Sequence, residues 1–361
     1  MIKRIGINNY RLLKNFSLDL TKFTCLIGLN GSGKTTLLQA LEGIGRLAHG
    51  EERMSLFGED CISFGLPPET PLRFSITFDD GIVWDASFDV QKQKFVSERI
   101  LHHGAVVLDS ETFKFAQGAQ LAKDASLLVP LDWDAGTPPD IVKKGLQSLK
   151  NLGLLSPALL RKGSGRDDNE IYNGGEGFAG FLYNFNGDDG KKLNREIKKF
   201  YKETNYYNVT SQGGGRYLHF KEKKNDFPAW RANDGLLRTL AILSQRYSPQ
   251  QFVLFDEIEN GFNQELVEEL VKELLDFNGK QVMVTTHSAL VVNFIPDEIA
   301  KESLVLLFKD SEGFTKARRF FDLDENRRLL KVLPSGQIMS QSNLVELSEQ
   351  FAREEAASCG S

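Results

Sequence analysis

The residues with the plainest chemical meaning lie between Gly28 and Thr35. This stretch reads Gly-Leu-Asn-Gly-Ser-Gly-Lys-Thr and fits the P-loop pattern G-x-x-x-x-G-K-[ST] at every fixed position. An apolar, β-prone run at 23–27 precedes it, and a helix-forming run follows it. Strand, glycine loop and helix, in this order, form the context in which such a loop cradles phosphates. The sequence therefore predicts a nucleoside triphosphate site, against the alternative of an ordinary glycine turn.

Each part of this loop has a predicted task. The glycines let the backbone curl so that successive N–H groups converge on phosphate oxygens, and the helix N-terminus adds positive potential. We expect Lys34 to reach the β- and γ-phosphates and the Thr35 hydroxyl to ligate Mg²⁺. The predicted cofactors are ATP and Mg²⁺. The predicted contact residues are Asn30, Gly31, Ser32, Gly33, Lys34, Thr35 and Thr36.

A second motif lies more than two hundred residues later, where Phe252-Val-Leu-Phe is followed by Asp256 and Glu257. An apolar strand that ends in Asp-Glu is the Walker B arrangement. Asp256 is expected to hold Mg²⁺ through water, and Glu257 to polarise the water that attacks the γ-phosphate. Two acids after a buried strand also occur as a helix N-cap pair. The P-loop on the same chain favours the catalytic interpretation.

The third candidate is His287, in the stretch Val-Thr-Thr-His-Ser just past the next buried strand. It lies 31 residues after Asp256, a distance that fits one helix and one strand. Ligands of α/β proteins bind at the carboxyl ends of strands, so His287 is expected to sense or orient the γ-phosphate. A purely structural histidine is the alternative.

Composition limits the classes of protein that the chain can belong to. The 361 residues are 41% apolar, which allows a sizeable core, and carry a formal charge of −5. Any contact with nucleic acid or an anionic membrane must therefore be local. The three cysteines, Cys25, Cys61 and Cys359, are unclustered, which fits a reducing cytoplasm and neither a disulfide framework nor a zinc site. No apolar run has the length of a membrane span, so no membrane partner is expected.

Periodicity predicts an α/β organisation. Strands are expected at 2–8 and 16–28 and a helix at 34–48; short alternating runs between 71 and about 110 predict an antiparallel β-meander. Residues 138–204 are predicted to be mostly helical, and a strand-like stretch follows around Tyr217–Lys221.

The second half of the chain alternates helix and buried strand. A helix at 235–247 is followed by apolar strands at 252–255 and 281–285 with a helix between them, which predicts a largely parallel sheet. The tail is expected to add strands and a helix. We expect three parts: an N-terminal ATPase lobe at 1–110, a mainly helical lobe at 111–232 and a C-terminal ATPase lobe at 233–361.

Together, the motifs resemble an ABC-type ATPase head, closest to the stand-alone AAA ATPases of the OLD, RecF and SMC kind. Asn233-Asp-Gly-Leu-Leu-Arg, some twenty residues before Walker B, resembles the signature loop of that family. The stretches 8–11, 156–160 and 173–178 are also similar to the family. The resemblance implies a P-loop fold with a mostly parallel core sheet, an antiparallel meander and a helical lobe.

The resemblance also implies how such a head acts. A second subunit would press Asn233 and Gly235 onto the first subunit's γ-phosphate, although the family's serine and threonine are replaced here by Asn233 and Leu236. Tyr10 or Arg11 would contact the adenine or the α-phosphate, with a strand-edge aromatic as the alternative for Tyr10. The implied partners are a second copy of the chain and an effector such as a nuclease or toxin, in anti-phage defence.

Two rival functions stay open at this point. A DNA-repair ATPase of the RecF or SMC type would bind DNA, and the basic stretch 191–202 with Phe200 and Tyr201 is its candidate surface. The ATPase subunit of a membrane transporter is the second rival. The missing Leu-Ser-Gly-Gly-Gln signature and the predicted meander count against it.

Overall fold

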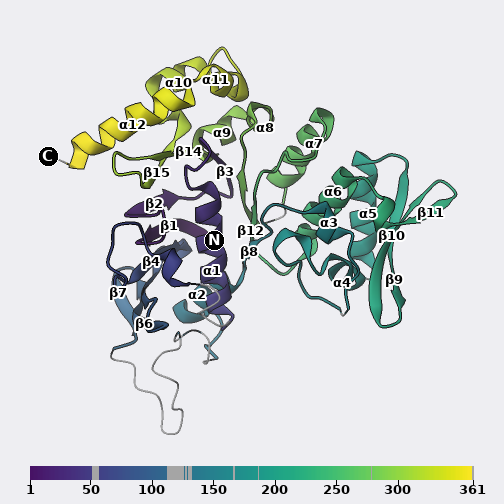
Figure 1. The fold of residues 1–361 in the computed structure, drawn as a ribbon, viewed down its shortest axis with the longest axis horizontal. Coiled ribbons are helices and arrows are strands. Elements are labelled where there is room, and N and C mark those ends of the chain that lie inside the picture. The colour runs from purple at the N-terminus through teal and green to yellow at the C-terminus, as the bar shows by residue number, and fades with distance from the viewer. Residues whose placement is uncertain are drawn as a thin grey trace, which may run out of the picture. The chain divides into compact units, whose positions relative to one another are not determined.

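The computed structural model describes residues 1–50, 57–111, 126, 128, 132–165, 167–185, 187–277 and 279–359 (Figure 1). Its contacts divide the chain into two compact units. Unit 1 comprises Met1–Lys150 and Pro296–Ser361, and unit 2 comprises Asn151–Ile295. The chain therefore leaves unit 1, builds unit 2 and returns to unit 1, a division that differs from the three consecutive lobes expected from the sequence.

A six-stranded antiparallel sheet in unit 1 has the strand order β2-β1-β4-β5-β6-β7 (Figure 1). Along β4 and β5 buried residues alternate with more exposed ones, as in strands that cover a core with one face. The predicted β-meander is confirmed. The strands are β1 (Ile2–Asn8), β2 (Phe16–Asp19), β4 (Leu72–Phe78), β5 (Ile82–Asp89), β6 (Lys94–His102) and β7 (Ala105–Asp109).

A second group of strands in unit 1 surrounds the P-loop. β3 (Phe23–Ile27), buried throughout, pairs in parallel with β14 (Leu304–Lys309), and β14 pairs antiparallel with β15 (Thr315–Arg319). The single strand expected at 16–28 is thus two strands, because β2 belongs to the meander sheet and β3 to this group.

Helix α1 (Lys34–Ala48) follows the P-loop over the range that the sequence predicted. It buries a stripe of leucines and isoleucine, including Leu37, Leu41 and Ile44. Helix α2 (Pro138–Gln147) contacts α1. The C-terminal helices of unit 1 are α9 (Asp297–Ser303), α10 (Asp324–Leu329), α11 (Ser335–Gln341) and α12 (Leu344–Cys359).

Unit 2 contains the second pair of parallel strands. Every residue of β12 (Phe252–Phe255) and β13 (Gln281–Thr285) is buried, and α7 (Gln264–Leu275) connects them. β12 and β13 pair in parallel, as expected for continuous apolar strands joined by a helix, so the predicted parallel pairing of these strands is confirmed. Unit 2 also contains α6 (Asp234–Ser244) and α8 (Ala289–Asn293), and β8 (Leu149–Asn151) lies where the chain passes from unit 1 to unit 2.

The remainder of unit 2 contains a sheet as well as the helices expected between 138 and 204. A three-stranded antiparallel sheet, β9 (Thr204–Gln212), β10 (Gly215–Glu222) and β11 (Asn225–Pro228), lies here, with β10 in the middle (Figure 1). Its helices are α3 (Pro157–Leu160), α4 (Phe178–Tyr183) and α5 (Asp188–Phe200), and α4 and α5 contact β9.

Within the described residues, no helix combines the length and the apolar composition that crossing a bilayer requires.

Candidate nucleotide-binding site

Two glycines of the P-loop are held where no larger residue fits. A Cβ added to Gly28, whose φ is +146°, would lie 2.4 Å from the Leu307 carbonyl oxygen of β14. A Cβ on Gly33, at φ +103°, would lie 2.2 Å from Thr315 Oγ1 of β15. The same Thr315 hydroxyl donates a 2.8 Å hydrogen bond to the Ser32 carbonyl. The hairpin of β14 and β15 therefore packs closely against the P-loop and restricts its shape.

The polar groups of the loop suit an anionic ligand. Lys34 is buried at the start of α1, and its Nζ donates to the carbonyls of Gly28 (2.9 Å) and Leu29 (3.0 Å). The buried Ser32 Oγ has no hydrogen-bond partner within the described residues. Asn30, Gly31 and Thr35 are exposed, and Thr36 is partly exposed. The loop thus combines an open rim with a buried cation and a buried, unsatisfied hydroxyl, which is what a cradle for phosphates requires.

Arg11 and Tyr10 lie elsewhere in unit 1 and make specific contacts. The Arg11 guanidinium donates to Gln39 Oε1 of α1 (2.6 Å) and to Asp60 (3.0 Å). Tyr10 is buried and packs edge-on against Phe57, with ring centres 5.8 Å apart. Burial raises the pKa of Tyr10 well above its usual range. The contacts of Tyr10 are those of a core residue, the alternative named for it above.

The acids of the Walker B motif are positioned by one hydroxyl that the sequence analysis did not single out. Thr285, fully buried at the end of β13, donates to Asp256 Oδ1 (2.5 Å) and accepts from the backbone N–H of Glu257 (2.8 Å). Glu257 adopts a left-handed backbone with φ 46°, a conformation that costs energy for a residue with a side chain. Thr285 therefore sets the orientation of both acids at once.

A further carboxylate organises the loop that carries His287. Glu259 accepts a hydrogen bond from the Thr286 hydroxyl (2.8 Å) and another from the His287 backbone N–H (2.9 Å). The His287 side chain is exposed. The structure thus joins the acidic run after β12 to the histidine loop after β13, within unit 2.

The predicted signature loop begins helix α6. Asn233 caps this helix by accepting from the Leu236 N–H (2.7 Å). Gly235 is buried, and a Cβ there would lie 2.6 Å from the Tyr201 hydroxyl of the same unit. A bulky residue at Gly235 would therefore disturb the packing of Tyr201 as well as any contact with a second subunit.

Helix α6 also reaches the catalytic candidate Glu257. Arg238 donates to the Asn260 carbonyl (2.6 Å), and the Asn260 amide lies 3.4 Å from Glu257 Oε2. A cavity of ≈ 10 Å³ is lined by Arg238, Asp256, Glu257 and Asn260, among others. This volume is on the scale needed for about one water molecule. Glu257 therefore lines a small, partly open cavity.

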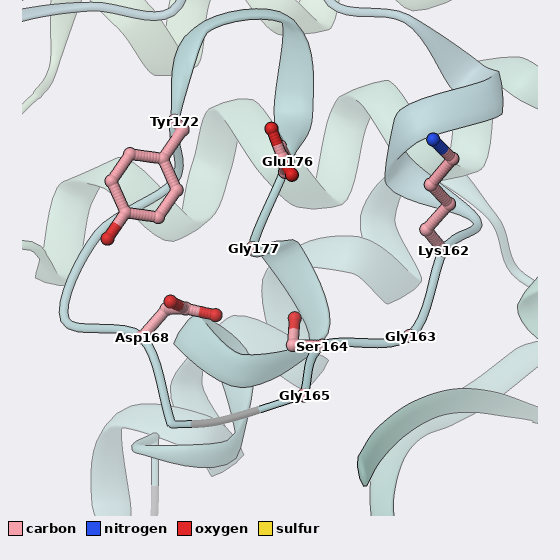
Figure 2. A pocket seen from close by; sticks show the side chains of 8 residues that line it. All are labelled: Lys162, Gly163, Ser164, Gly165, Asp168, Tyr172, Glu176 and Gly177. Atoms are coloured by element: carbon pink, nitrogen blue, oxygen red, sulfur yellow. The ribbon is translucent and has the colours of Figure 1, made fainter.

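A larger pocket in unit 2, of ≈ 590 Å³, is separate from these motifs (Figure 2). Its polar side chains include Asp168, Glu176, Tyr172 and Lys162, and Figure 2 shows them on the loops that lead into α4. Two carboxylates in the lining repel a triphosphate. This pocket is therefore unsuited to ATP.

The predicted magnesium ligands, Thr35 and Asp256, belong to unit 1 and unit 2 respectively. No cluster of three or more His, Cys, Asp or Glu side chains encloses a metal site in the part of the chain that the structure describes. Mg²⁺ commonly uses one or two protein ligands together with waters and substrate phosphates. Within unit 1 the Thr35 residue is exposed, and within unit 2 the Asp256 carboxylate accepts a hydrogen bond from Thr285.

The role of Thr285 gives a testable prediction. We expect Thr285→Val to lower ATP turnover roughly tenfold or more, because it leaves the Glu257 N–H and Asp256 without this partner, at a cost of ~1–3 kcal/mol. Thr285→Ser keeps the hydroxyl and is the matched control. Phosphate release by the two variants, with thermal melts to establish folding, checks the prediction. Equal turnover by the Val and Ser variants would show that the Thr285 hydroxyl does not support turnover.

Comparison with known proteins places the chain in a family. Residues 23–293 match the family model described as "AAA domain, putative AbiEii toxin, Type IV TA system". The chain belongs to this family. The matched range covers more than half of the sequence and includes the P-loop, Walker B and His287.

Other matches agree with this assignment. A 42-residue stretch is 43% identical to the OLD nuclease of Thermus scotoductus, covering 12% of this chain and 8% of the nuclease. The Smc head domain bound to the C-winged helix domain of ScpA shares the fold with a TM-score of 0.54 at 17% identity, over 91% of this chain and 99% of that one. A second Smc head, from Pyrococcus furiosus, has a TM-score of 0.55 at 13% identity, over 91% of this chain and 98% of that one. The predicted ABC-type, OLD- and SMC-like fold is confirmed.

Proposed function

We propose that the chain is a Mg²⁺-dependent ATPase. The observation that carries the proposal is the P-loop itself, which the β14–β15 hairpin buttresses and which holds the buried Lys34 and the unsatisfied Ser32 hydroxyl. The backbone N–H groups and Lys34 would bind the triphosphate, and Thr35 and Asp256 would hold Mg²⁺. Bound Mg²⁺ would neutralise charge on the phosphates.

In this proposal the side chains of unit 2 carry the chemistry. Glu257 would accept a proton from the attacking water. It lines the small cavity described above, whose volume is on the scale of one water molecule. Glu259 would position the His287 loop so that the imidazole meets the γ-phosphate. Thr285 and Asn260 would orient Glu257 without touching the nucleotide.

We further propose that two copies pair around ATP and control an effector protein, such as a nuclease or toxin, in anti-phage defence. Membership of a family described as a toxin of a type IV TA system and the short match to an OLD nuclease support this assignment. The exposed Asn233 at the start of α6 is the group that would meet the second copy's nucleotide. We propose a cytoplasmic location on the same grounds.

The structure weakens the basic helix α5 as a DNA-binding surface. Three of its lysines form ion pairs with acids of the same unit: Lys191 with Asp188, Lys192 with Asp189 and Lys199 with Glu273. Lysines that pair with carboxylates have less charge to offer to phosphates. A repair ATPase of the SMC kind stays the second candidate function, because it shares the fold.

The pairing proposal predicts a change of mass with ATP. We expect the wild-type chain to double its mass in light scattering after size exclusion when ATP and Mg²⁺ are present, and to stay monomeric with ATP and a chelator. Asn233→Asp keeps the helix cap but adds a negative charge, so it should prevent pairing and leave nucleotide binding intact. An equal wild-type mass with ATP and Mg²⁺ and with ATP and a chelator would contradict the pairing.

A further inference from the structure

The outward face of the sheet β9–β10 combines exposed aromatic rings with hydrogen-bonding and basic side chains. One face of the sheet is buried, through residues such as Tyr207, Leu218 and Phe220, and α4 and α5 contact its strands. The other face carries alternate residues that are exposed or partly exposed. These are Tyr206, Asn208 and Thr210 on β9 and Tyr217, His219 and Lys221 on β10.

The register places these six residues in three cross-strand pairs. Lys221 lies opposite Tyr206, His219 opposite Asn208, and Tyr217 opposite Thr210. The two tyrosines are therefore four residues apart along the sheet, or roughly 13 Å at the usual strand rise. At this separation each ring can hold a different base. Their side chains are 42% (Tyr206) and 44% (Tyr217) exposed, a large fraction for aromatic residues inside a regular sheet.

Both tyrosines are held in place by their neighbours. Lys221 Nζ lies 5.7 Å from the centre of the Tyr206 ring. A Cβ at Gly163 would lie 2.7 Å from Cε1 of Tyr217, and one at Gly215 would lie 2.9 Å from Cε2, so glycines make room for this ring. Lys162, next to Gly163, is exposed and is drawn in Figure 2. Lys221 therefore lies over the Tyr206 ring, and Lys162 precedes the glycine that lies beside the Tyr217 ring.

The charge distribution favours an anionic occupant. None of the six outward residues of β9 and β10 is acidic. Residues 188–228 contain ten Lys and Arg against six Asp and Glu, whereas the whole chain has a formal charge of −5. Asp226 on β11 lies opposite Lys221 on this same face, and its carboxylate lies 3.7 Å from His219 Nδ1, so the β11 edge of the face carries an acid. A polyanion would therefore run along β9 and β10 and avoid β11.

We propose that this face binds single-stranded nucleic acid. Tyr206 and Tyr217 would stack with bases, and Lys221 and Lys162 would contact phosphates. Between the rings, Asn208 would donate a hydrogen bond and the Thr210 hydroxyl, which donates to the Tyr217 carbonyl, would accept one. Exposed aromatic residues on an antiparallel sheet with flanking cations form the usual platform for unpaired bases, because every base offers a face for stacking. The site depends on unit 2 alone and does not rest on ATP binding or on pairing.

Fluorescence anisotropy with labelled oligo(dT) and oligo(rU) twenty-mers, on the full chain without nucleotide, tests the proposal. We expect binding of at least one of them and much weaker binding of a twenty-base-pair duplex, whose bases are already stacked. Tighter binding of oligo(rU) would identify RNA as the ligand, and tighter binding of oligo(dT) would identify DNA. Lys34→Ala, which affects only the proposed ATP site, should bind as wild type does.

Variants of the two rings separate stacking from general charge attraction. Tyr206→Ala and Tyr217→Ala should each weaken binding about five- to a hundredfold, whereas Tyr206→Phe and Tyr217→Phe, which keep the rings, should bind nearly as wild type. Lys221→Gln should lower the slope of log affinity against log salt by about 0.7. Failure of both oligonucleotides to bind, equal binding of the duplex, or equal binding by the Ala and Phe variants would overturn the proposal.

Discussion

Replacement of Lys34 with alanine is expected to weaken ATP binding by one to two orders of magnitude or more. The ammonium group is buried in the P-loop and supplies the loop's only cationic side chain. Hydrogen bonds to charged groups contribute ~1.5–3 kcal/mol each, which corresponds to a change of that size in affinity. Isothermal titration calorimetry with a non-hydrolysable ATP analogue and Mg²⁺ measures the loss directly.

The control for Lys34 is Lys22, an exposed lysine at the far end of the strand that leads into the P-loop. Lys22 lies just before β3, whereas the P-loop follows β3. Lys22→Ala removes the same charge and should leave ATP affinity unchanged. Both variants should melt close to the wild-type temperature. Unaltered ATP affinity in a folded Lys34→Ala variant would remove the basis for the nucleotide site.

Replacement of Glu257 with glutamine is expected to abolish most turnover while leaving Mg-ATP binding intact. Glutamine keeps the volume and can keep the contact with Asn260, but it cannot accept the proton from water. Loss of a general base costs on the order of 10²–10⁴ in rate. Phosphate release under single-turnover conditions, with affinity from calorimetry, separates the chemical step from binding.

The same variant reports on pairing. If hydrolysis separates two paired copies, Glu257→Gln should accumulate as an ATP-bound dimer, or a larger even assembly, on size exclusion. Asp256→Asn should instead weaken the response to Mg²⁺, because Asp256 is the proposed metal ligand. Wild-type turnover by Glu257→Gln would refute its role as base. Lost turnover without assembly would support Glu257 as the general base and would refute the ATP-dependent pairing of two copies.

The parts of the fold that follow from local pattern were predictable. The P-loop glycines, the buried strand before them and the leucine stripe of α1 are neighbours in sequence, so pattern and structure agree. The same holds for β12 and β13, which are apolar throughout. Of the sheet β9–β11, only the stretch around Tyr217–Lys221 of β10 was expected as a strand. β9 was missed because Asn, Thr, Ser and Gln outnumber the apolar residues along it.

The contacts that support the site were not predictable from pattern. Thr315 meets the P-loop from 283 residues away, and the hydroxyl of Thr285 joins two acids across a separation of 28 or 29 residues. A threonine in an apolar strand gives no sign of such a partner. Glu259 follows Asp256 by three residues, but only the fold shows that it holds the His287 loop.

Release of phosphate from ATP by the purified wild-type chain is the most direct test of the proposed function. The account predicts that the chain releases phosphate in the presence of Mg²⁺, that a chelator stops the release, and that Glu257→Gln is at least a hundredfold slower at saturating ATP. Two results would contradict it: a folded wild-type chain that binds no ATP, or equal rates of phosphate release by the wild-type chain and Glu257→Gln.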